Sequence, residues 1–425
     1  MESRLFSNRW SLLLAAPLVA GPLAGQIELA ALTSAPTPLD SIVNPPLPAT
    51  SAPTRGASAP WSSWPQATGA WGGLRPQLTE AGLALEATYV YDLSGNARGG
   101  RRRGSAGRGL LSAGLAGDLE QLVGLPGASV FVGMQSWSGA NGSALAGDFQ
   151  AFSNIDAAHF LHLAEAWYEQ RLAGDRARLK AGQVDANSEF AVLEPAGEFL
   201  NASGGFSPTI YALPTYPEPA PSVSAFVQPT GWLSLSGGLF RGGLARSARP
   251  GAPTGAAFVI AEATGRWSTG HVAIGYWRHP GGVAERLGGG FATAPDGVYL
   301  TADQRLTGAP GTEERGSSGL VAFAKYGRAD EQVSAAGQHL MVGVVEEAPF
   351  GRDGEAAGLM VSHVDLSDVP AAGFDGNETA VELFYRVPAT GFLTLRPDLQ
   401  LIARPSGDSR LGNALVGTLR AELAF

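Results

Sequence analysis

Charged and aromatic side chains recur at two-residue spacing in two neighbouring stretches of the sequence. The first stretch contains Glu165, Trp167, Glu169 and Arg171. In the second, Arg178 and Lys180 flank Leu179. A strand places residues of this spacing on one face, where ionised groups form short hydrogen bonds to hydroxyls and an indole ring covers apolar C–H groups. The six residues are therefore candidates for a polar site that contacts a ligand. In the alternative interpretation they form ion pairs that brace the fold, with Trp167 at its rim.

The longest stretch without strand periodicity follows, from about Gly182 to Pro221. It supplies a second set of polar candidates: Asp185, Asn187, Glu189, Glu194, Glu198 and Asn201. Short acidic and amide side chains also hold turns by bonding to nearby backbone groups, so Asp185, Asn187 and Glu189 have an alternative interpretation as loop anchors. We interpret the sequence from Ser153 to Asp156 in the same way, as a turn with local side-chain caps.

Sequence signatures of catalysis and metal binding are absent. The chain has no Cys, which excludes disulfides, thiol chemistry and Cys-ligated metals, and its six His are scattered without metal-site spacing. No nucleophile elbow, HExxH motif, phosphate-binding loop or dinucleotide fingerprint occurs. The formal charge of −9 argues against nucleic-acid binding, and we interpret the one basic run, Arg98 to Arg108, as a solvated loop. We therefore predict a protein that is not an enzyme and that needs no cofactor or metal.

Short stretches of alternating apolar and polar residues must position these candidates. In residues 413–425, Leu415, Leu419, Leu423 and Phe425 fall on one face, and Thr418, Arg420 and Glu422 fall on the other. Such stretches lie near residues 82, 108, 128, 161, 176, 222, 232, 256, 270, 296, 319, 338, 358, 378, 391 and 413. They predict an all-β protein of about sixteen strands. Pro397 lies inside one of them, where the missing backbone donor predicts a bulge or a local break.

The position of the charges distinguishes two all-β folds. No run of about 18 to 20 apolar residues occurs beyond the N-terminal region, so a membrane span there cannot be helical. In a transmembrane antiparallel β-barrel, Arg396, Arg420 and Glu422 must face a wet interior, because each costs a few kcal/mol near the bilayer midplane. In a soluble β-sandwich the leucines instead face a dry core. The apolar N-terminal stretch, the terminal Phe and the unbroken series of strands favour the barrel. Its last strand is then expected to pair with the first, near Leu83 to Tyr91.

Composition divides the chain into three parts. Residues 1–25 contain Arg4 and Arg9 and then an apolar stretch, which is the pattern of a secretory signal peptide. Residues 26–65 are rich in Pro, Ala and Ser and carry almost no charge, which predicts a flexible segment. Residues 66–425 contain the predicted barrel.

Several short motifs, taken in order, are similar to those of a known family. They are Trp71-Gly-Gly-Leu-Arg75, Ser153 to Asp156, the group Glu165, Trp167, Glu169 and Gln170, the stretches 181–190 and 197–203, and Arg396-Pro-Asp-Leu-Gln400. Together they span residues 64–425, and their order and spacing resemble the carbohydrate-selective porins of the OprB type. The Pro-rich segment and the basic run depart from the family pattern.

The resemblance implies a barrel of sixteen strands in the lipid of the Gram-negative outer membrane, with the segment after the fifth strand folded inward to narrow the pore. It also implies passive diffusion of monosaccharides such as glucose, or of small oligosaccharides. Because sugars are neutral and hydrated, pore diameter, fixed polar groups and aromatic faces have to select them. Two alternatives stay open: a general-diffusion porin without sugar preference, and a soluble secreted all-β binding protein. Both a monomer and a homotrimer are compatible with the sequence.

Overall fold

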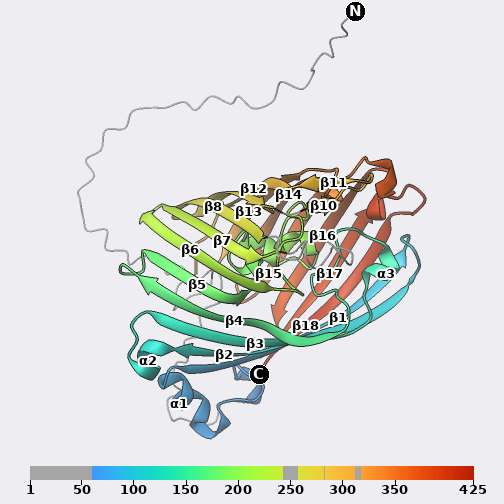
Figure 1. The fold of residues 1–425 in the computed structure, drawn as a ribbon. Helices are drawn as coiled ribbons and strands as arrows, with labels where there is room; N and C mark the ends of the chain where they lie inside the picture. The colour runs from blue at the N-terminus through green and yellow to red at the C-terminus, as the bar shows by residue number, and fades with distance from the viewer. Residues whose placement is uncertain (1–59, 243–256, 282, 312–316) are drawn as a thin grey trace, which may run out of the picture. The chain divides into compact units, whose positions relative to one another are not determined.

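The fold is described from a computed structural model that covers residues 60–242, 257–281, 283–311 and 317–425. In these residues sixteen antiparallel strands close into a barrel (Figure 1). The barrel strands are β1 (Leu83–Arg98), β2 (Gly104–Asp118), β3 (Ala128–Gly139), β4 (Phe160–Leu172), β5 (Ala177–Val184), β6 (Ala220–Thr230), β7 (Leu233–Arg241), β8 (Ala257–Trp267), β9 (Gly270–Arg278), β12 (Asp296–Arg305), β13 (Gly319–Ala329), β14 (Ala336–Glu347), β15 (Ala356–Leu366), β16 (Asn377–Pro388), β17 (Leu393–Ala403) and β18 (Ala414–Ala424). A separate short hairpin joins β10 (Val283–Glu285) to β11 (Phe291–Thr293).

Short helices occupy the connections between strands. They are η2 (Trp61–Ser63), η3 (Trp71–Gly73), α1 (Leu74–Glu80), α2 (Leu119–Val123), α3 (Ser143–Ala146), η4 (Ala186–Ser188), α4 (Glu194–Gly197), α5 (Ala202–Gly205), η5 (Pro370–Ala372) and η6 (Pro405–Gly407). Among the residues that the structure describes, no helix is both long and apolar enough to cross a membrane.

The prediction of an all-β barrel with sixteen strands is confirmed. Each barrel strand begins within about four residues of its predicted position. The hairpin of β10 and β11 was not predicted, since each of its strands is too short to show alternation. The predicted signal peptide, residues 1–25, and residues 26–59 of the predicted flexible segment lie outside the described residues.

The alternation of side chains separates an apolar outer surface from a polar interior. Large apolar side chains are exposed on the outer face, including Leu93 and Leu419, whereas Asp92, Glu382 and Arg420 on the inner face are almost completely buried. An apolar outer band and a polar lumen are the arrangement that a barrel needs in lipid. The prediction that charges face the interior is confirmed.

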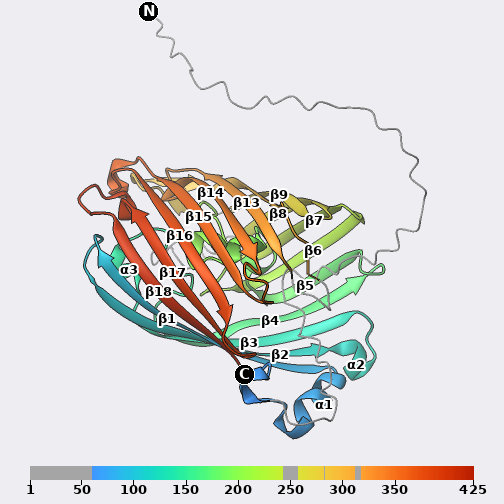
Figure 2. The same cartoon turned by 180° about the vertical axis from the view of Figure 1, so that it is seen from behind.

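The first and last strands close the barrel, as the alternating pattern of residues 413–425 predicted. β1 pairs with β18 in a register that sets Asp92 opposite Arg420. The last residue is held on both sides, because Phe425 N donates to Ala87 O at 2.9 Å and Arg75 Nη1 donates to Phe425 O at 3.0 Å. Figure 2 shows the C-terminus at the end of this seam, beside α1. The residues just before β1 therefore secure the closure.

Pro397 interrupts the barrel on one side only. Its strand β17 pairs with β18 without a shift, but the pairing with β16 stops after Phe384 opposite Asp398 and resumes at Val387 opposite Leu395. The register is the same on both sides of the gap. The expected local break is present, and it is not a bulge.

A β-bulge in β4 turns the candidate residues of that strand toward the lumen. The ladder between β3 and β4 shifts between Gly133 and Met134, which leaves Ala164 as an extra residue in β4. Consequently Leu163 is exposed on the outer face while the Glu165 carboxylate reaches inward. The bulge therefore places the polar residues after Ala164 on the lumen side.

Two connections fold into the barrel. The long inner segment (residues 185–219) follows β5, as expected, and appears as the green coil within the ring of strands in Figure 1. The short inner segment (residues 140–159) follows β3 and was not predicted. The two are bonded to each other, because Asn154 N donates to Leu200 O at 2.6 Å and Ala202 N donates to Ala151 O at 2.9 Å. Together they form one partition across the lumen.

The basic run from Arg98 to Arg108 is not a single solvated loop, so that interpretation is wrong. Arg98 ends β1, and the loop that joins it to β2 is limited to residues 99–103. Arg108 lies in β2 with its side chain completely buried. The loop arginines and the buried Arg108 could not be distinguished in the sequence, because the basic run includes both a turn and the inward-facing residues of a strand.

Candidate functional site

Four of the predicted residues form one buried cluster at the start of the long inner segment, which we call the β4–β5 charge cluster: Glu169, Arg178, Lys180 and Glu189. Arg178 bridges Glu169 Oε2 at 2.7 Å and Glu189 Oε2 at 2.6 Å, and Lys180 Nζ lies 2.7 Å from Glu189 Oε1. Burial opposes ionisation of Glu189, but the adjacent Lys180 and Arg178 cations hold its pKa below the usual value. The cluster therefore ties the inner segment to the wall through complementary charges.

Aromatic rings cover the two cations of this cluster. Lys180 Nζ lies 3.7 Å from the ring centroid of Trp167, and the Arg178 guanidinium lies 3.7 Å from that of Phe226. Each contact adds a cation–π attraction and keeps water from the ion pairs. Trp167 thus lies beside the buried cluster inside the barrel, and not at its rim.

Three further predicted residues shape the first turn of the long inner segment. Glu165 Oε1 accepts a hydrogen bond from Asp185 N at 3.1 Å. The Asp185 carboxylate accepts from Asn187 N at 2.8 Å and from Tyr216 N at 3.0 Å, and so joins the two ends of the segment. Asn187 donates to Phe190 O at 3.2 Å. The contacts of Asp185 and Asn187 fit their interpretation as loop anchors, and Glu165 binds the same turn from the barrel wall.

Glu198 belongs to a more accessible group, which we call the lumen ion pairs. Its carboxylate lies 2.5 Å from Arg386 Nη1 and 3.4 Å from Arg396 Nη2, and Arg396 also reaches Glu422 at 3.3 Å. The Glu198, Arg386 and Glu422 side chains retain exposed fractions of 24%, 26% and 32%. Water and solutes can therefore reach charges that are already paired.

The remaining predicted residues are dispersed. Arg171 lies 3.7 Å from Glu169 and is about one-third exposed. Glu194 is exposed at the start of α4. Asn201 is fully buried, where it caps α5 and donates to Gln400 Oε1 at 3.2 Å. Asn201 therefore acts inside the partition, away from the accessible lumen surface.

Charged side chains of the wall also bind the backbone of the long inner segment, which the sequence did not predict. The Glu382 carboxylate accepts from Leu200 N at 2.5 Å and from Asn201 N at 3.0 Å. Lys325 Nζ donates to the three carbonyls of residues 203–205 at 3.2, 2.9 and 3.1 Å. These contacts depend on the path of the segment and involve no sequence motif within it.

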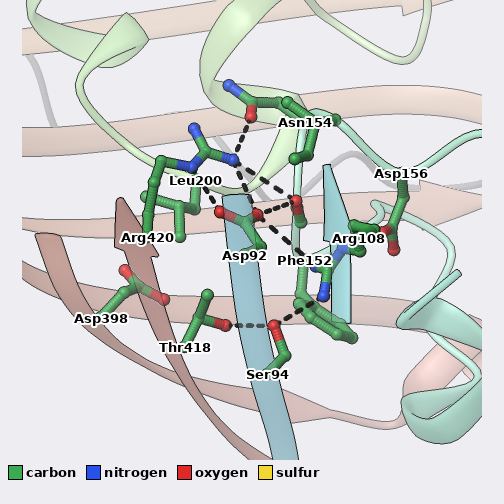
Figure 3. A network of polar contacts seen from close by, with 12 residues as sticks. Asp92, Ser94, Arg108, Phe152, Asn154, Asp156, Leu200, Asp398, Thr418 and Arg420 are labelled. Atoms are coloured by element: carbon green, nitrogen blue, oxygen red, sulfur yellow. Dashed lines mark hydrogen bonds and ion pairs between the residues drawn. The ribbon is translucent and has the colours of Figure 1, made fainter. Parts of the chain in front are cut away.

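The short inner segment is held by a polar network at the barrel seam, which we call the seam network (Figure 3). Asp92 accepts two hydrogen bonds from Arg420 at 2.7 and 2.9 Å and one from Ser153 Oγ at 2.6 Å. Arg108 Nε lies 2.5 Å from Asp156 Oδ1. The predicted turn from Ser153 to Asp156 is present, since Asp156 N donates to Ser153 O at 3.0 Å. The interpretation of its side chains as local caps is wrong, because they bind residues of β1, β2 and β18. Those partners are distant in sequence, so no local pattern could reveal them.

One stretch of the lumen wall stays open. On β1 to β4 a cavity of about 130 Å³ is lined by polar and small residues together with Phe131: Glu86, Thr88, Ser112, Gly114, Gly133, Gln135 and Glu165. Gly114 and Gly133 border the Phe131 ring so closely that a Cβ atom at either would lie 2.5 or 2.7 Å from it. Glu86 and Thr88 are exposed although they face inward. Among the residues that line this cavity, only Glu165 was a predicted site residue. The others could have been identified because they lie on the polar face of predicted strands.

The described residues contain no group of three or more His, Asp or Glu side chains arranged to hold a metal ion. The arrangement consists of a closed wall, two inner segments bonded to each other, and paired charges.

Comparisons with known proteins agree with this geometry. The model of the family described as carbohydrate-selective porin, OprB family, matches residues 102–425. Porin B of Pseudomonas aeruginosa is 28% identical over 150 residues, covering 30% of this chain and 32% of that protein. That match therefore spans about a third of the curated relative's length.

Solved structures show the same fold. The high-pH structure of Pseudomonas putida OprB has a TM-score of 0.77 at 21% identity and covers 87% of this chain and 100% of that one. The low-pH structure of Pseudomonas putida OprB has a TM-score of 0.57 at 19% identity, with 85% and 99% covered. Family and fold together indicate a channel rather than an enzyme, located in the outer membrane of Gram-negative bacteria. Since the family match extends over most of its length, the chain belongs to the carbohydrate-selective porin, OprB, family.

Proposed function

We propose that the chain forms a water-filled pore through which monosaccharides such as glucose, or small oligosaccharides, diffuse passively across the outer membrane. Family membership and the partitioned barrel support this proposal. Diffusion down a gradient requires no cofactor, metal or chemical step, and we propose no enzymatic activity.

The observation that carries the proposal is the pairing of the accessible charges. Glu198 lies between Arg386 and Arg396, and Arg396 is shared with Glu422. Paired charges produce a weaker field at a distance than isolated ones, so they attract free ions less strongly. At contact they still form strong hydrogen bonds with hydroxyl groups. A polyhydroxylated neutral solute therefore gains more from this lumen than an ion does.

Accessibility divides the candidate residues into two roles. We assign contact with sugar to the accessible ones, Glu165, Arg171, Glu194 and Glu198, with Glu86 and Gln135 of the open wall. The others fix the long inner segment: Trp167, Glu169, Arg178, Lys180, Asp185, Asn187, Glu189 and Asn201. Arg171, Glu194 and Glu198 are partly or largely exposed, and Glu165, half-buried like Trp167 and Asp185, is included because it lines the open cavity. The residues of the second group contact one another or the long inner segment.

Liposome swelling tests the pore and its preference together. Proteoliposomes that contain the purified chain are expected to swell faster in glucose than in an inert neutral solute of the same size. Arg386→Ala should reduce the glucose rate because Glu198 loses a partner and one hydroxyl-binding group is removed, whereas Arg410→Ala in the exposed connection before β18 should not. Equal rates for the two solutes would support the general-diffusion alternative. No swelling at all would refute the pore.

Three further expectations complete the proposal. Residues 1–25 form a cleaved signal peptide, residues 26–65 a flexible segment and residues 66–425 the barrel, which N-terminal sequencing of the exported protein and limited proteolysis would test. The exposed outer leucines contact lipid, as an apolar outer band requires. The barrel functions as a monomer or a homotrimer, and sedimentation in detergent distinguishes these states by mass.

A further inference from the structure

A series of buried hydrogen bonds connects the two inner segments by way of two side chains of the barrel wall, His339 in β14 and Ser362 in β15. It begins at Thr209 and Ser207 of the long inner segment, whose hydroxyl oxygens are 2.7 Å apart. Ser207 Oγ lies 3.0 Å from His339 Nδ1, and His339 Nε2 lies 2.9 Å from Ser362 Oγ. Ser362 donates to Gln150 Oε1 of the short inner segment at 2.5 Å. All five side chains are at most 3% exposed.

The strands provide space for this chain of bonds. His339 in β14 lies opposite Gly327 in β13. A Cβ atom at Gly327 would lie 2.1 Å from Thr209 Oγ1 and 2.4 Å from Ser207 Oγ. Only a residue without a side chain therefore lets the long inner segment approach His339 here. Two positions earlier in β13, Lys325 binds the carbonyls of residues 203–205 and holds the same part of the segment.

The donors and acceptors along the chain determine its direction. Ser362 donates its one hydroxyl proton to Gln150, so toward His339 it can only accept. His339 must then carry a proton on Nε2. In a neutral ring Nδ1 is an acceptor, so Ser207 donates to it and in turn accepts the hydroxyl proton of Thr209. One tautomer of one ring thus satisfies both segments.

We propose that His339, as the neutral tautomer protonated on Nε2, is a positioning residue of the pore that couples the two inner segments and thereby sets its width. His339 contacts no solute itself and acts through Ser207 and Ser362. The inference deepens the proposed function, and only its transport experiment depends on that function.

The first test is the protonation state of the ring, which does not depend on transport. Nitrogen-15 NMR of the full chain in detergent micelles, with His339→Gln to assign the signal among the six histidines, should show one neutral tautomer protonated on Nε2. A ring protonated on Nδ1, or on both nitrogens, would overturn the proposal.

The second test is a double-mutant cycle on solute discrimination. His339→Leu should raise the ratio of trisaccharide to glucose swelling rates about threefold, because the loosened partition widens the pore. Gln150→Leu should have a similar effect. The double variant should exceed neither single variant, because both changes interrupt the same chain of bonds. Additive effects, or an unchanged ratio in either single variant, would contradict the coupling.

Matched variants separate coupling from general damage. His363→Leu alters the neighbour of Ser362 on the opposite face of β15, where His363 Nδ1 lies 2.7 Å from Thr379 Oγ1, and should leave the ratio unchanged. His339→Gln keeps a donor near Ser362 but loses the bond to Ser207, so it should still raise the ratio. His339→Gln also replaces His339→Leu in the swelling experiment if the leucine variant does not fold. Folding is checked on gels, where a folded barrel and its heated, unfolded form migrate differently. If the wild-type chain does not transport sugar, the proposed function fails while the NMR result still decides the state of His339.

Discussion

The two inner segments enter the same lumen, and both combine apolar packing with buried charged contacts, but these contacts are distributed differently. In the long inner segment, Phe199 lies 4.8 Å from Phe384 and 5.6 Å from Phe323 between ring centroids, and the charged contacts are spread over the β4–β5 charge cluster, Lys325 and Glu382. In the short inner segment, Phe152 packs in a cluster with Ile402 and Val416, and the charged contacts of Ser153 and Asp156 are concentrated in the seam network. The short inner segment therefore depends more strongly on a single group of charges.

The difference has a thermodynamic consequence. Apolar burial hardly depends on pH, whereas hydrogen bonds to ionised partners are lost when protonation changes. Buried ion pairs also leave an uncompensated charge when one partner is removed. We therefore expect the loss of one charge in the seam network to act mainly on the short inner segment, and the loss of one aromatic ring at Phe199 to act mainly on the long one.

The largest effect is expected at the seam network. Asp92→Ala leaves Arg108 and Arg420 buried without their shared carboxylate, and should lower the free energy of unfolding by about 3 to 5 kcal/mol. Urea unfolding in detergent micelles, followed by tryptophan fluorescence, measures the change. Asp408→Ala removes the partner of the exposed Arg410 and serves as the control, with an expected loss below about 1 kcal/mol. Equal losses in the two variants would refute the special role of the seam.

A volume change should act on the other segment. Phe199→Ala opens a cavity between Phe323 and Phe384 and should destabilise the packing by about 3 kcal/mol. Because the sixteen-stranded ladder is unaffected, the expected signature is faster hydrogen exchange in residues 185–219 while exchange in the barrel strands is unchanged. Phe291→Ala at a largely exposed position should alter neither. If Phe199→Ala instead made hydrogen exchange faster only in residues 140–159, the ring would stabilise the short inner segment rather than the long one.

Charge removal in the accessible group should change selectivity more than stability. Glu198→Gln leaves Arg386 and Arg396 without their shared anion, so the lumen becomes more positive; the stability loss should stay below about 1 kcal/mol because the pairs are partly exposed. Reversal potentials across a planar bilayer with a salt gradient should shift toward anion preference. Glu120→Gln, in the connection between β2 and β3, should give no shift. An unchanged potential for Glu198→Gln would show that this group does not border the conducting path.

The smallest expected effect is a pH dependence of the short inner segment. Burial and the nearby Glu378 carboxylate raise the pKa of Asp148 from 3.8 to about 7. A carboxyl whose pKa is raised by folding contributes stability below its unfolded pKa and loses that contribution as pH rises through the folded value. Hydrogen exchange in residues 140–159, corrected for intrinsic rates, should therefore become faster between about pH 4 and pH 7. Asp148→Asn should reduce this dependence, with a remainder from Asp156, whose pKa burial also raises. An unchanged dependence in that variant would exclude Asp148 as its cause.

The strands and the facing of their side chains were accessible from the sequence. Alternation at Leu419, Arg420 and Glu422 predicted an apolar outer face and a polar inner face, and the structure has both. The candidates from Glu169 to Glu189 were identified because two adjacent strands and the start of the next segment bring them together locally.

The remaining site residues could not be predicted because their partners are distant along the chain. Asp92 meets Arg420 only after the first and last strands close. Glu382 binds backbone N–H groups of the long inner segment, which every residue except proline possesses. The residue types at positions 200 and 201 therefore do not predict that contact.

The sequence by itself determined an all-β chain of about sixteen strands and the face on which each side chain lies, because strand alternation is a local property that each stretch expresses alone. Only the tertiary structure decided that two segments enter the lumen, which charges they meet, and which polar residues remain open to a solute. The reason is physical: a buried charge in the interior must find a partner wherever the closed ring of strands places one. That place is set by barrel closure and by the path of the inner segments, not by neighbours in the chain.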